Sequence, residues 1–347
     1  MTNPINPLDA LENKRWFKLI CGASYQEVSV IRNLALVYCL AGADCIDVSA
    51  DEAVLKAAQD GISQALALGA GSPPWLMVSF NDAQDPHFRK AWFDAAQCPS
   101  SCSRPCLTVC PTDAIAASVV QERCYGCGRC LSLCPYGLIE ARGFTTEVAQ
   151  LAPRLLPYVH AVEIHTQTGH QAQFQRLWQQ LASYLDRLEL VSISCPDPSP
   201  SDDRVLQYLR ELYALMHPRP KRLMWQTDGR SMSGDIGKGT TYPTMRFAQK
   251  FLAAGLPGYV QLAGGTNHHT WSKLQQSDAL RNRVHGIAYG SYARRLIDLS
   301  QAPFKLELQP LMLEQAIGQA QSLIRPMKQA TAAAARTPLG DRATMPP

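Results

Sequence analysis

Eight of the twelve cysteines of the chain are concentrated between residues 98 and 134. The second half of this block has the spacing of the bacterial ferredoxin run that binds a four-iron cluster, Cys124-x2-Cys127-x2-Cys130-x3-Cys134-Pro135. Three thiolates at this spacing converge on three corners of one cubane, and Gly126 and Gly128 let the backbone approach its sulfides. The fourth cysteine points away from that cubane, so the block predicts a second cluster.

The first half of the block is a variant of the same motif, Cys98-x3-Cys102-x3-Cys106-x3-Cys110-Pro111. Carried over from two-cluster ferredoxins, the pattern predicts one 4Fe-4S cluster held by Cys124, Cys127, Cys130 and Cys110. The other cluster is expected on Cys102, Cys106, Cys134 and Cys98. Because the first motif has three-residue gaps where the usual motif has two, Cys98 can lie too far from its iron, and a 3Fe-4S or labile cluster is the alternative.

Structural zinc is the main alternative for this block, because zinc sites also use closely spaced cysteines. The cysteines here come in fours, end in Cys-Pro and have no histidine nearby, which favours iron and sulfide. The remaining cysteines lie elsewhere, and we expect core packing for Cys39 and Cys45. Cys21 and Cys195 each end a strand-like run, where a reactive thiol or an extra ligand is the alternative to core packing.

The elements that must position these cysteines alternate along the chain as eight strand–helix units. The strand-like runs are residues 17–24, 45–50, 75–80, 161–166, 190–195, 222–227, 259–265 and 286–291. Alternation of this kind predicts a parallel sheet, and eight units favour a closed (β/α)8 TIM-like barrel over an open doubly wound sheet.

The cysteine block falls between the third strand and its helix, so it is predicted to be a ferredoxin-like module inserted into the barrel. The expected division is 1–97 for the first part of the barrel, 98–140 for the module, 141–327 for the rest of the barrel with a final helix from about 309, and 328–347 for a flexible tail. Loops that follow barrel strands lie on the face where barrel active sites form, so the clusters are expected above the barrel mouth.

Small residues after the last two strands indicate an anion site at that mouth. The candidates for binding a phosphate, FMN or another phosphate-bearing ligand are Gly264, Gly265, Thr266, Gly290 and Ser291. Turn formation alone is the alternative. A long glycine-rich loop at 227–241 suggests a lid, and Arg230, Lys238, Arg294 and Arg295 are candidates for added positive charge. His268 and His269 are expected at the surface, and spacing alone identifies no catalytic residue or carboxylate pair.

Composition limits the class of protein further. Hydrophobic residues make up 46% of the 347 residues and charged residues 18%, which excludes wholesale disorder, and a net charge of +4 gives no support for nucleic-acid binding. The most apolar window, residues 28–46, contains Arg32 and Asn33, so a buried helix is expected there rather than a transmembrane segment. We expect a cytoplasmic protein whose thiols stay reduced.

Three segments in this order, "CPSSCSRPCLTVCPTDAI", "CYGCGRCLSLCPYG" and "DGRSMSGDIGKGTT", resemble the cyanobacterial light-dependent period (LdpA) family, as does the later "QLAGGTN". The resemblance covers most of the chain except the tail. It implies an iron–sulfur protein of the circadian input pathway that reports cellular redox state, and so light, to the clock. It also implies association with circadian clock proteins and an input histidine kinase.

Three functions are consistent with these features. The first is regulation, in which redox-active clusters change a partner contact. The second is a TIM-barrel oxidoreductase that receives electrons from the clusters, with flavin or a phosphorylated substrate at the mouth and ferredoxin or quinone as redox partner. The third is simple electron transfer, which needs only the ferredoxin portion and leaves the barrel unexplained. Regulation is favoured, and enzymatic activity stays open.

Overall fold

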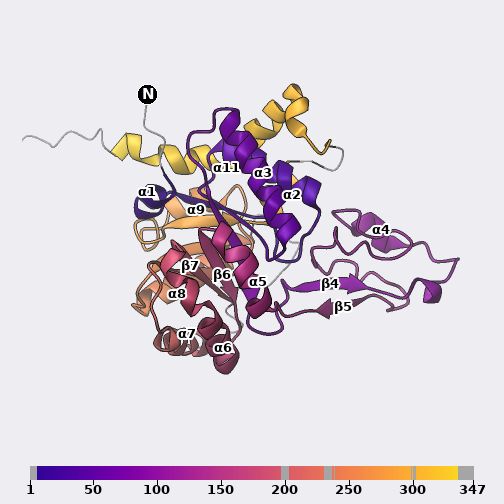
Figure 1. Cartoon of the computed structure of the whole chain (residues 1–347), viewed down its shortest axis with the longest axis horizontal. Helices are drawn as coiled ribbons and strands as arrows, with labels where there is room; N and C mark the ends of the chain where they lie inside the picture. The colour runs from indigo at the N-terminus through magenta and orange to yellow at the C-terminus, as the bar shows by residue number, and fades with distance from the viewer. Residues whose placement is uncertain are drawn as a thin grey trace, which may run out of the picture.

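The computed structural model describes residues 6–196, 203–229, 237, 239–297, 299 and 302–334 of the chain. Eight parallel strands form a closed barrel in the order β1-β10-β9-β8-β7-β6-β3-β2 (Figure 1). They are β1 (Trp16–Ile20), β2 (Cys45–Ser49), β3 (Trp75–Asn81), β6 (Ala161–His165), β7 (Leu190–Pro196), β8 (Leu223–Asp228), β9 (Tyr259–Ala263) and β10 (Gly286–Tyr289). The barrel prediction is confirmed, and the open-sheet alternative is wrong because β1 pairs with β10, Trp16 opposite Gly286.

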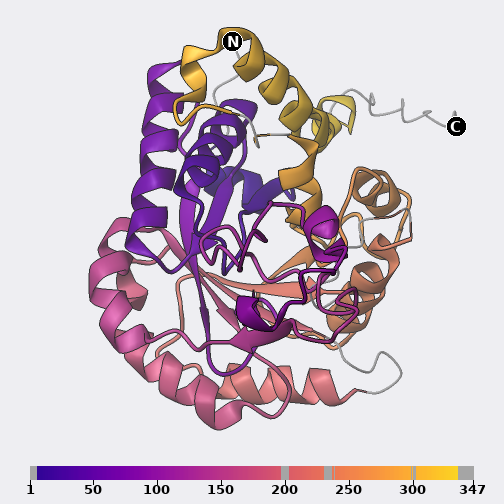
Figure 2. The ribbon, with the colours of Figure 1, turned by 90° about the vertical axis from the view of Figure 1, so that its right-hand side faces the viewer.

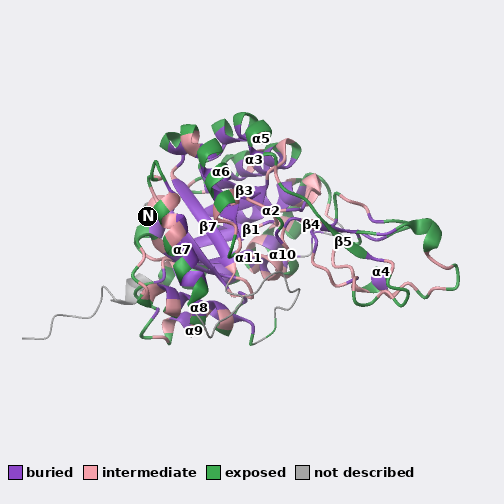
Figure 3. Cartoon of the chain, turned by 90° about the horizontal axis from the view of Figure 1, so that it is seen from below, coloured by how far each residue is buried: buried purple, intermediate pink, exposed green. Residues whose placement is uncertain are grey.

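Helices surround the barrel and cover the outer faces of its strands (Figure 2). They are α2 (Val28–Ala41), α3 (Glu52–Ala67), α5 (Val148–Leu155), α6 (Gln171–Leu181), α7 (Arg204–Leu215), α8 (Thr241–Ala253), α9 (Thr270–Gln275) and α10 (Ser291–Leu296). A short helix α1 (Pro7–Glu12) precedes the first strand. Each helix is apolar on the side that faces the sheet and polar on the other, so purple strands lie inside a partly green shell in Figure 3.

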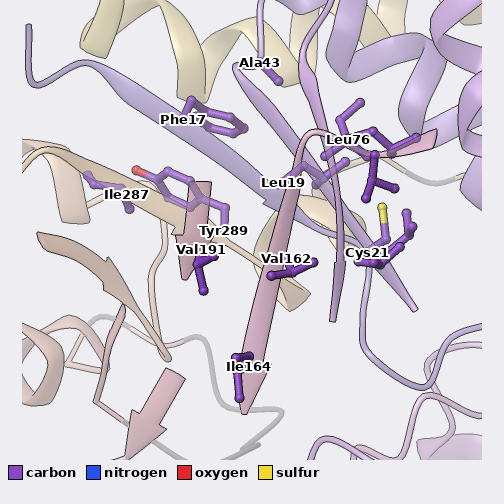
Figure 4. Close-up of a cluster of buried hydrophobic side chains, with 14 of the residues drawn as sticks. Phe17, Leu19, Cys21, Ala43, Leu76, Val162, Ile164, Val191, Ile287 and Tyr289 are labelled. Carbon is purple, nitrogen blue, oxygen red and sulfur yellow. The ribbon is translucent and has the colours of Figure 1, made fainter. Parts of the chain in front are cut away.

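Successive residues of each strand point alternately to the helices and into the barrel. Phe17, Leu19, Val162 and Ile164 belong to the main apolar core together with helix residues, and Figure 4 shows their side chains. The Phe17 ring stacks on that of Tyr289, with the ring centroids 5.1 Å apart. Four cysteines outside the block are buried in apolar clusters, as expected for core packing: Cys21, Cys39, Cys45 and Cys195. Burial raises the pKa of the Cys21 thiol to about 12, so at neutral pH it is not a reactive thiolate.

The last helix, α11 (Pro310–Ala334), corresponds to the helix expected from about residue 309, but it continues past 327, where the tail was expected to begin. Its apolar side joins the main core through Ala320, Ile324 and Met327. The Lys328 ammonium on this helix bonds the buried Asp44 carboxylate, and so ties the helix to the barrel. In the described part of the chain, no helix is both long and apolar enough to cross a membrane.

The ferredoxin-like module leaves the barrel after β3 and returns before α5, as predicted for an insertion after the third strand. It extends beyond the predicted bounds of 98–140 at both ends, because the strands at its base also lie outside the barrel. Its two ends run side by side as an antiparallel pair, β4 (Arg89–Trp92) and β5 (Glu140–Gly143), with Arg89 opposite Gly143. A short helix α4 (Pro105–Val109) lies farther out in the module, which projects from one end of the barrel (Figure 1). The module has its own apolar cluster, which includes Phe93, Ile115 and Ile139.

Candidate iron–sulfur and barrel-mouth sites

Four cysteines from the two halves of the block line a single small cavity in the module: Cys110, Cys124, Cys127 and Cys130. This is the set expected to share one cluster, three from the second motif and the last cysteine of the first. Gly126 allows the tight approach that the set needs, because its φ is +72° and a Cβ there would lie 2.1 Å from the Arg89 carbonyl oxygen. The donor set, all sulfur, suits an iron–sulfur cluster.

Backbone N–H groups point at the sulfurs. Ala91 N–H donates to Cys124 Sγ at 3.3 Å and Ala114 N–H to Cys110 Sγ at 3.2 Å. Leu138 N–H donates to Cys134 Sγ at 3.3 Å. Slight burial opposes ionisation of Cys134, but backbone N–H groups of the following turn outweigh it and lower its pKa. Such donors stabilise the thiolate form, which is the form that ligates iron.

In the first motif Cys98 lies beside Cys102 and Cys106. Arg104 N–H donates to Cys102 Sγ at 3.4 Å, and Cys106 is buried in the apolar cluster of the module, against which Cys98 and Cys134 pack. These positions are compatible with the expected second ligand set. Ligation by Cys98, and a three-iron form of this cluster, stay predictions.

The loop that carries the second motif touches the barrel through Tyr125, which sits between Cys124 and Cys127. Tyr125 is buried, and its ring centroid lies 5.9 Å from that of Tyr25 in a T-shaped contact. On another side the Arg294 guanidinium carbon lies 4.6 Å from the Tyr125 ring centroid, and Arg294 Nη1 donates to the Ile20 carbonyl at 2.8 Å. One aromatic side chain therefore connects the cysteine loop to β1 and α10.

Below Tyr125 a cavity of about 90 Å³, here called the mouth cavity, opens into the carboxyl end of the barrel. All five residues predicted to bind a phosphate or flavin line it: Gly264, Gly265, Thr266, Gly290 and Ser291. Tyr125 and Arg294 line the same cavity, so the cysteine loop lies over the barrel mouth as expected.

The five predicted residues also have structural partners. Gly265 has a φ of +90°, and a Cβ there would lie 2.4 Å from the Thr240 carbonyl oxygen, so a close backbone approach requires glycine. The Thr266 hydroxyl donates to the Ala288 carbonyl at 2.6 Å, and Ser291 Oγ accepts from Arg294 at 3.2 Å. Turn formation and loop packing therefore explain part of this small-residue pattern.

The other residues named for the mouth are dispersed. Arg295 lines a separate groove between barrel and module, while Arg230 and Lys238 lie outside the described residues. His268 is exposed, as expected, and its Nδ1 lies 2.9 Å from the Tyr292 hydroxyl. His269 is partly exposed and its ring centroid lies 3.7 Å from that of His268.

A buried charged network on the inner face of the barrel, which sequence spacing did not identify, forms the floor of the mouth cavity. The Lys18 ammonium on β1 bonds the Glu163 carboxylate on β6, and it lies 3.1 Å from Asp47 Oδ2 on β2. Glu163 also accepts hydrogen bonds from Ser192 Oγ at 2.9 Å and Gln226 Nε2 at 3.0 Å. Burial opposes both charges, but the pairing outweighs it, so the pKa of Glu163 falls and that of Lys18 rises.

Two histidines and two aspartates lie above this network. His165 Nε2 is 3.1 Å from Glu163 Oε1, and His87 Nδ1 is 2.8 Å from Asp85 Oδ1. His87 Nε2 lies 3.9 Å from Asp228 Oδ2. Burial lowers the basicity of His87, but Asp85 outweighs this effect and raises the pKa of His87 to about 9. The mouth therefore holds groups able to bind a cation or transfer a proton.

A pattern in the sequence could have identified the floor. Polar residues alternate with apolar ones inside strands that are otherwise buried, as Lys18 in β1, Asp47 in β2, Glu163 in β6 and Gln226 in β8. In an ordinary barrel both faces of such strands are apolar, so this alternation marks a polar interior. Asp85 and His87 gave no such signal, because they lie in a loop.

Two family models match this chain. Residues 98–145 match the family model described as the LdpA Fe-S cluster-binding domain, and residues 156–326 match the light dependent period A C-terminal domain. A protein named light dependent period A from Synechococcus elongatus is 51% identical over 342 residues, which cover 95% of this chain and 96% of the relative.

Shorter and more distant similarities also occur. The putative electron transport protein YsaA of Escherichia coli is 41% identical over 54 residues, 14% of this chain and 34% of that protein. Among solved structures, the YdjI aldolase of Escherichia coli has 7% identity and a TM-score of 0.46, covering 92% of this chain and 94% of that one.

The identity over nearly the whole length of both chains, together with matches to both family models, shows that this chain belongs to the light-dependent period A family of iron–sulfur proteins.

Proposed function

We propose that the chain senses cellular redox state through two iron–sulfur clusters and reports it, as a signal of light, to the circadian clock. The proposal is supported by the family, by the cysteine-lined cavity and by the likeness of the module to electron transport proteins. Clock proteins and an input histidine kinase are the proposed partners, as the family resemblance implies.

When bound, the clusters supply one-electron redox chemistry. Cys110, Cys124, Cys127 and Cys130 would hold one, and Cys98, Cys102, Cys106 and Cys134 the other. The protein's own contribution is to present N–H donors to the sulfurs, to bury the second motif and to connect it to the barrel. Burial and these donors are the features by which a protein sets a cluster's potential.

The observation that favours sensing over simple electron transfer is the position of Tyr125. It is flanked by two ligand cysteines, and its ring is packed against Tyr25 and beneath the Arg294 guanidinium. A change of charge or shape in the cysteine loop therefore acts directly on β1 and α10. An electron carrier has no need of such a contact.

Hydrogen exchange of the oxidised and the dithionite-reduced protein tests this coupling. We expect the exchange rates of residues 20–26 and 290–296 to differ between the two states. Tyr125→Leu should abolish that difference while leaving the visible absorption of the clusters unchanged. Tyr136→Leu is the matched control, because Tyr136 lies in the same module but is 50% exposed. Identical exchange in both redox states of the unaltered protein would contradict sensing through the barrel.

A second candidate function is a barrel oxidoreductase that receives electrons from the clusters. The buried network of Lys18, Asp47 and Glu163 below the cysteine loop favours it, because charged groups are costly to bury and often mark a reactive site. The cavity of about 90 Å³ is small for FMN, whose size calls for a pocket of roughly 300 Å³ or more. A flavin band in the visible spectrum of the purified protein would support FMN, and calorimetry with small phosphorylated compounds tests the smaller ligand.

A further inference from the structure

Asp85, His87 and His165 form a cluster that is separate from the cysteines. Each offers one ligand atom, and these three atoms lie within 4.8 Å of one another. Asp85 Oδ1 is 2.8 Å from His87 Nδ1 and 3.8 Å from His165 Nδ1. Metal–ligand bonds of about 2.0–2.2 Å place neighbouring ligand atoms about 3.0–3.5 Å apart, so small side-chain movements suffice to centre an ion.

His165 is held as metal-binding histidines are held. Its Nε2 lies 3.1 Å from the Glu163 carboxylate, which fixes the ring orientation and leaves Nδ1 as the free nitrogen. Glu163 is in turn fixed by Lys18, Ser192 and Gln226. The Glu163 carboxylate thus orients His165 from the side of the ring opposite to Asp85 and His87.

Two atoms of this region lack partners. Within the described part of the chain, neither His165 Nδ1 nor Asp228 Oδ1 has a hydrogen-bond partner. Both residues are buried, at 5% and 4% exposure, and both line the mouth cavity. A buried polar atom without a partner is costly, so both atoms are positioned to accept a ligand.

The charges around the cavity also favour a cation. Among the described residues of the cavity, the floor network and this cluster, the carboxylates of Asp47, Asp85, Glu163 and Asp228 face Lys18, Arg294 and His87, whose pKa Asp85 raises to about 9. The four carboxylates outnumber these three cations. Buried carboxylates in excess need a compensating positive charge.

We propose that Asp85, His87 and His165 bind one divalent transition-metal ion at the mouth cavity, above the floor network, with an Asp228 carboxylate oxygen as a nearby fourth ligand. Two imidazoles and one carboxylate are the donor set of mononuclear non-haem iron and of many zinc sites, which keep coordination positions open for water or substrate. The mouth cavity, at about 90 Å³, has room for such waters. The site is independent of the clusters and of the sensing function proposed above.

Manganese titration tests the site in the protein with its clusters intact. Mn²⁺ is suited to oxygen and nitrogen ligands and has little affinity for thiolates, so it avoids the cysteines. Anaerobically prepared protein, first dialysed against a chelator, is titrated with Mn²⁺, and free Mn²⁺ is measured by room-temperature EPR. We expect one saturable ion per chain and nitrogen couplings from two imidazoles in the pulsed EPR of the bound ion.

Variants distinguish binding at this site from non-specific binding of Mn²⁺. Asp85→Asn and His165→Gln should each abolish saturable binding, and Glu163→Gln should weaken it about 10- to 100-fold. His170→Gln is the matched control, because His170 also pairs with an aspartate, Asp82 at 3.1 Å, but offers no atom to the cluster. Circular dichroism and cluster absorption verify folding of each variant.

The proposal is overturned if the unaltered protein binds no Mn²⁺ saturably, or if bound Mn²⁺ shows no nitrogen coupling. Equal binding in Asp85→Asn and in the unaltered protein would also overturn it. Because Asp85 lies in a loop, Asp85→Asn keeps the test valid should the β6 variants fail to fold. None of these results depends on sensing, so failure here leaves the redox proposal intact.

Discussion

The two ends of the barrel interior differ in chemistry although the same strands build both. At the amino end the interior is filled by apolar side chains. The rings of Trp16 and Trp75 make an edge-to-face contact, with their centroids 5.4 Å apart, and the same apolar cluster includes Met77, Leu190 and Met224. Farther along the strands the interior becomes polar, and it is charged at Lys18, Asp47 and Glu163. The amino end thus supplies packing energy, while the carboxyl end carries the groups that bind or react, as in barrels generally.

Histidines show the contrast most directly. At the amino end His160 Nδ1 accepts a hydrogen bond from the Leu76 N–H at 3.2 Å, and His285 Nδ1 accepts one from the Val260 N–H at 3.1 Å. Because Nδ1 is the acceptor, it carries no proton in either ring. Burial lowers the pKa of both, to about 4 for His285. At the mouth His87 faces carboxylates and its pKa rises instead. One residue type therefore serves as a backbone acceptor at one end and as a charge partner at the other.

Removing the central cation of the mouth should have the largest effect. Lys18→Met leaves Glu163 and Asp47 buried without their cation, which should lower the free energy of unfolding by about 3–5 kcal/mol. Urea denaturation measures the loss. Adding Glu163→Gln to Lys18→Met should recover part of it, since one uncompensated charge is removed. Full stability of the single variant would show that the floor charges are not coupled.

Creating a cavity at the amino end of the barrel should lower the free energy of unfolding somewhat less. Met224→Ala removes a fully buried side chain from the apolar cluster and should lower the unfolding free energy by about 2–5 kcal/mol. Because the packing there is separate from the charged layer, Mn²⁺ binding and the cluster spectrum should stay unchanged. A loss of Mn²⁺ binding in this variant would show that the two ends are not independent.

The amino-end histidine predicts a pH dependence. The pKa of His285 is about 4 in the folded chain against an ordinary value of 6.5, so its contribution to stability is present above pH 6.5 and is lost as pH falls through 4. In His285→Asn an amide oxygen replaces the acceptor but does not titrate. Between pH 6.5 and 4 the unaltered protein should therefore lose about 1–3 kcal/mol more stability than this variant. Parallel stability curves would contradict the assignment.

Removing one hydrogen bond at the mouth should change the free energy of unfolding least. Ser192→Ala removes the hydroxyl that donates to Glu163 Oε2 at 2.9 Å, and should lower the unfolding free energy by about 1 kcal/mol. Thermal unfolding measures it. A loss as large as that of Lys18→Met would mean that Ser192, rather than Lys18, is the main support of Glu163.

The sequence was sufficient to predict the barrel and the grouping of Cys110 with Cys124, Cys127 and Cys130 around one cavity, for different reasons. Each barrel strand is a buried apolar run next to an amphipathic helix, and ferredoxin spacing is dictated by the size of a cubane, so both signals are local. The β4–β5 pair was not predicted, because short strands such as Glu140–Gly143 are exposed and charged and show no apolar alternation. The proposed metal ligands come from separate segments, Asp85 and His87 from a loop and His165 from β6. Only the folded barrel brings them together.

The side-by-side departure and return of the module has an evolutionary consequence. Since β3 pairs directly with β6, Met77 opposite Ala161, the cyclic order of barrel strands is the same with or without the intervening segment. Arg89 and Gly143, paired across the short ribbon, mark a single junction at which a cassette can be gained, lost or exchanged without rebuilding the host. A redox-inert barrel can in this way acquire redox chemistry in one genetic step.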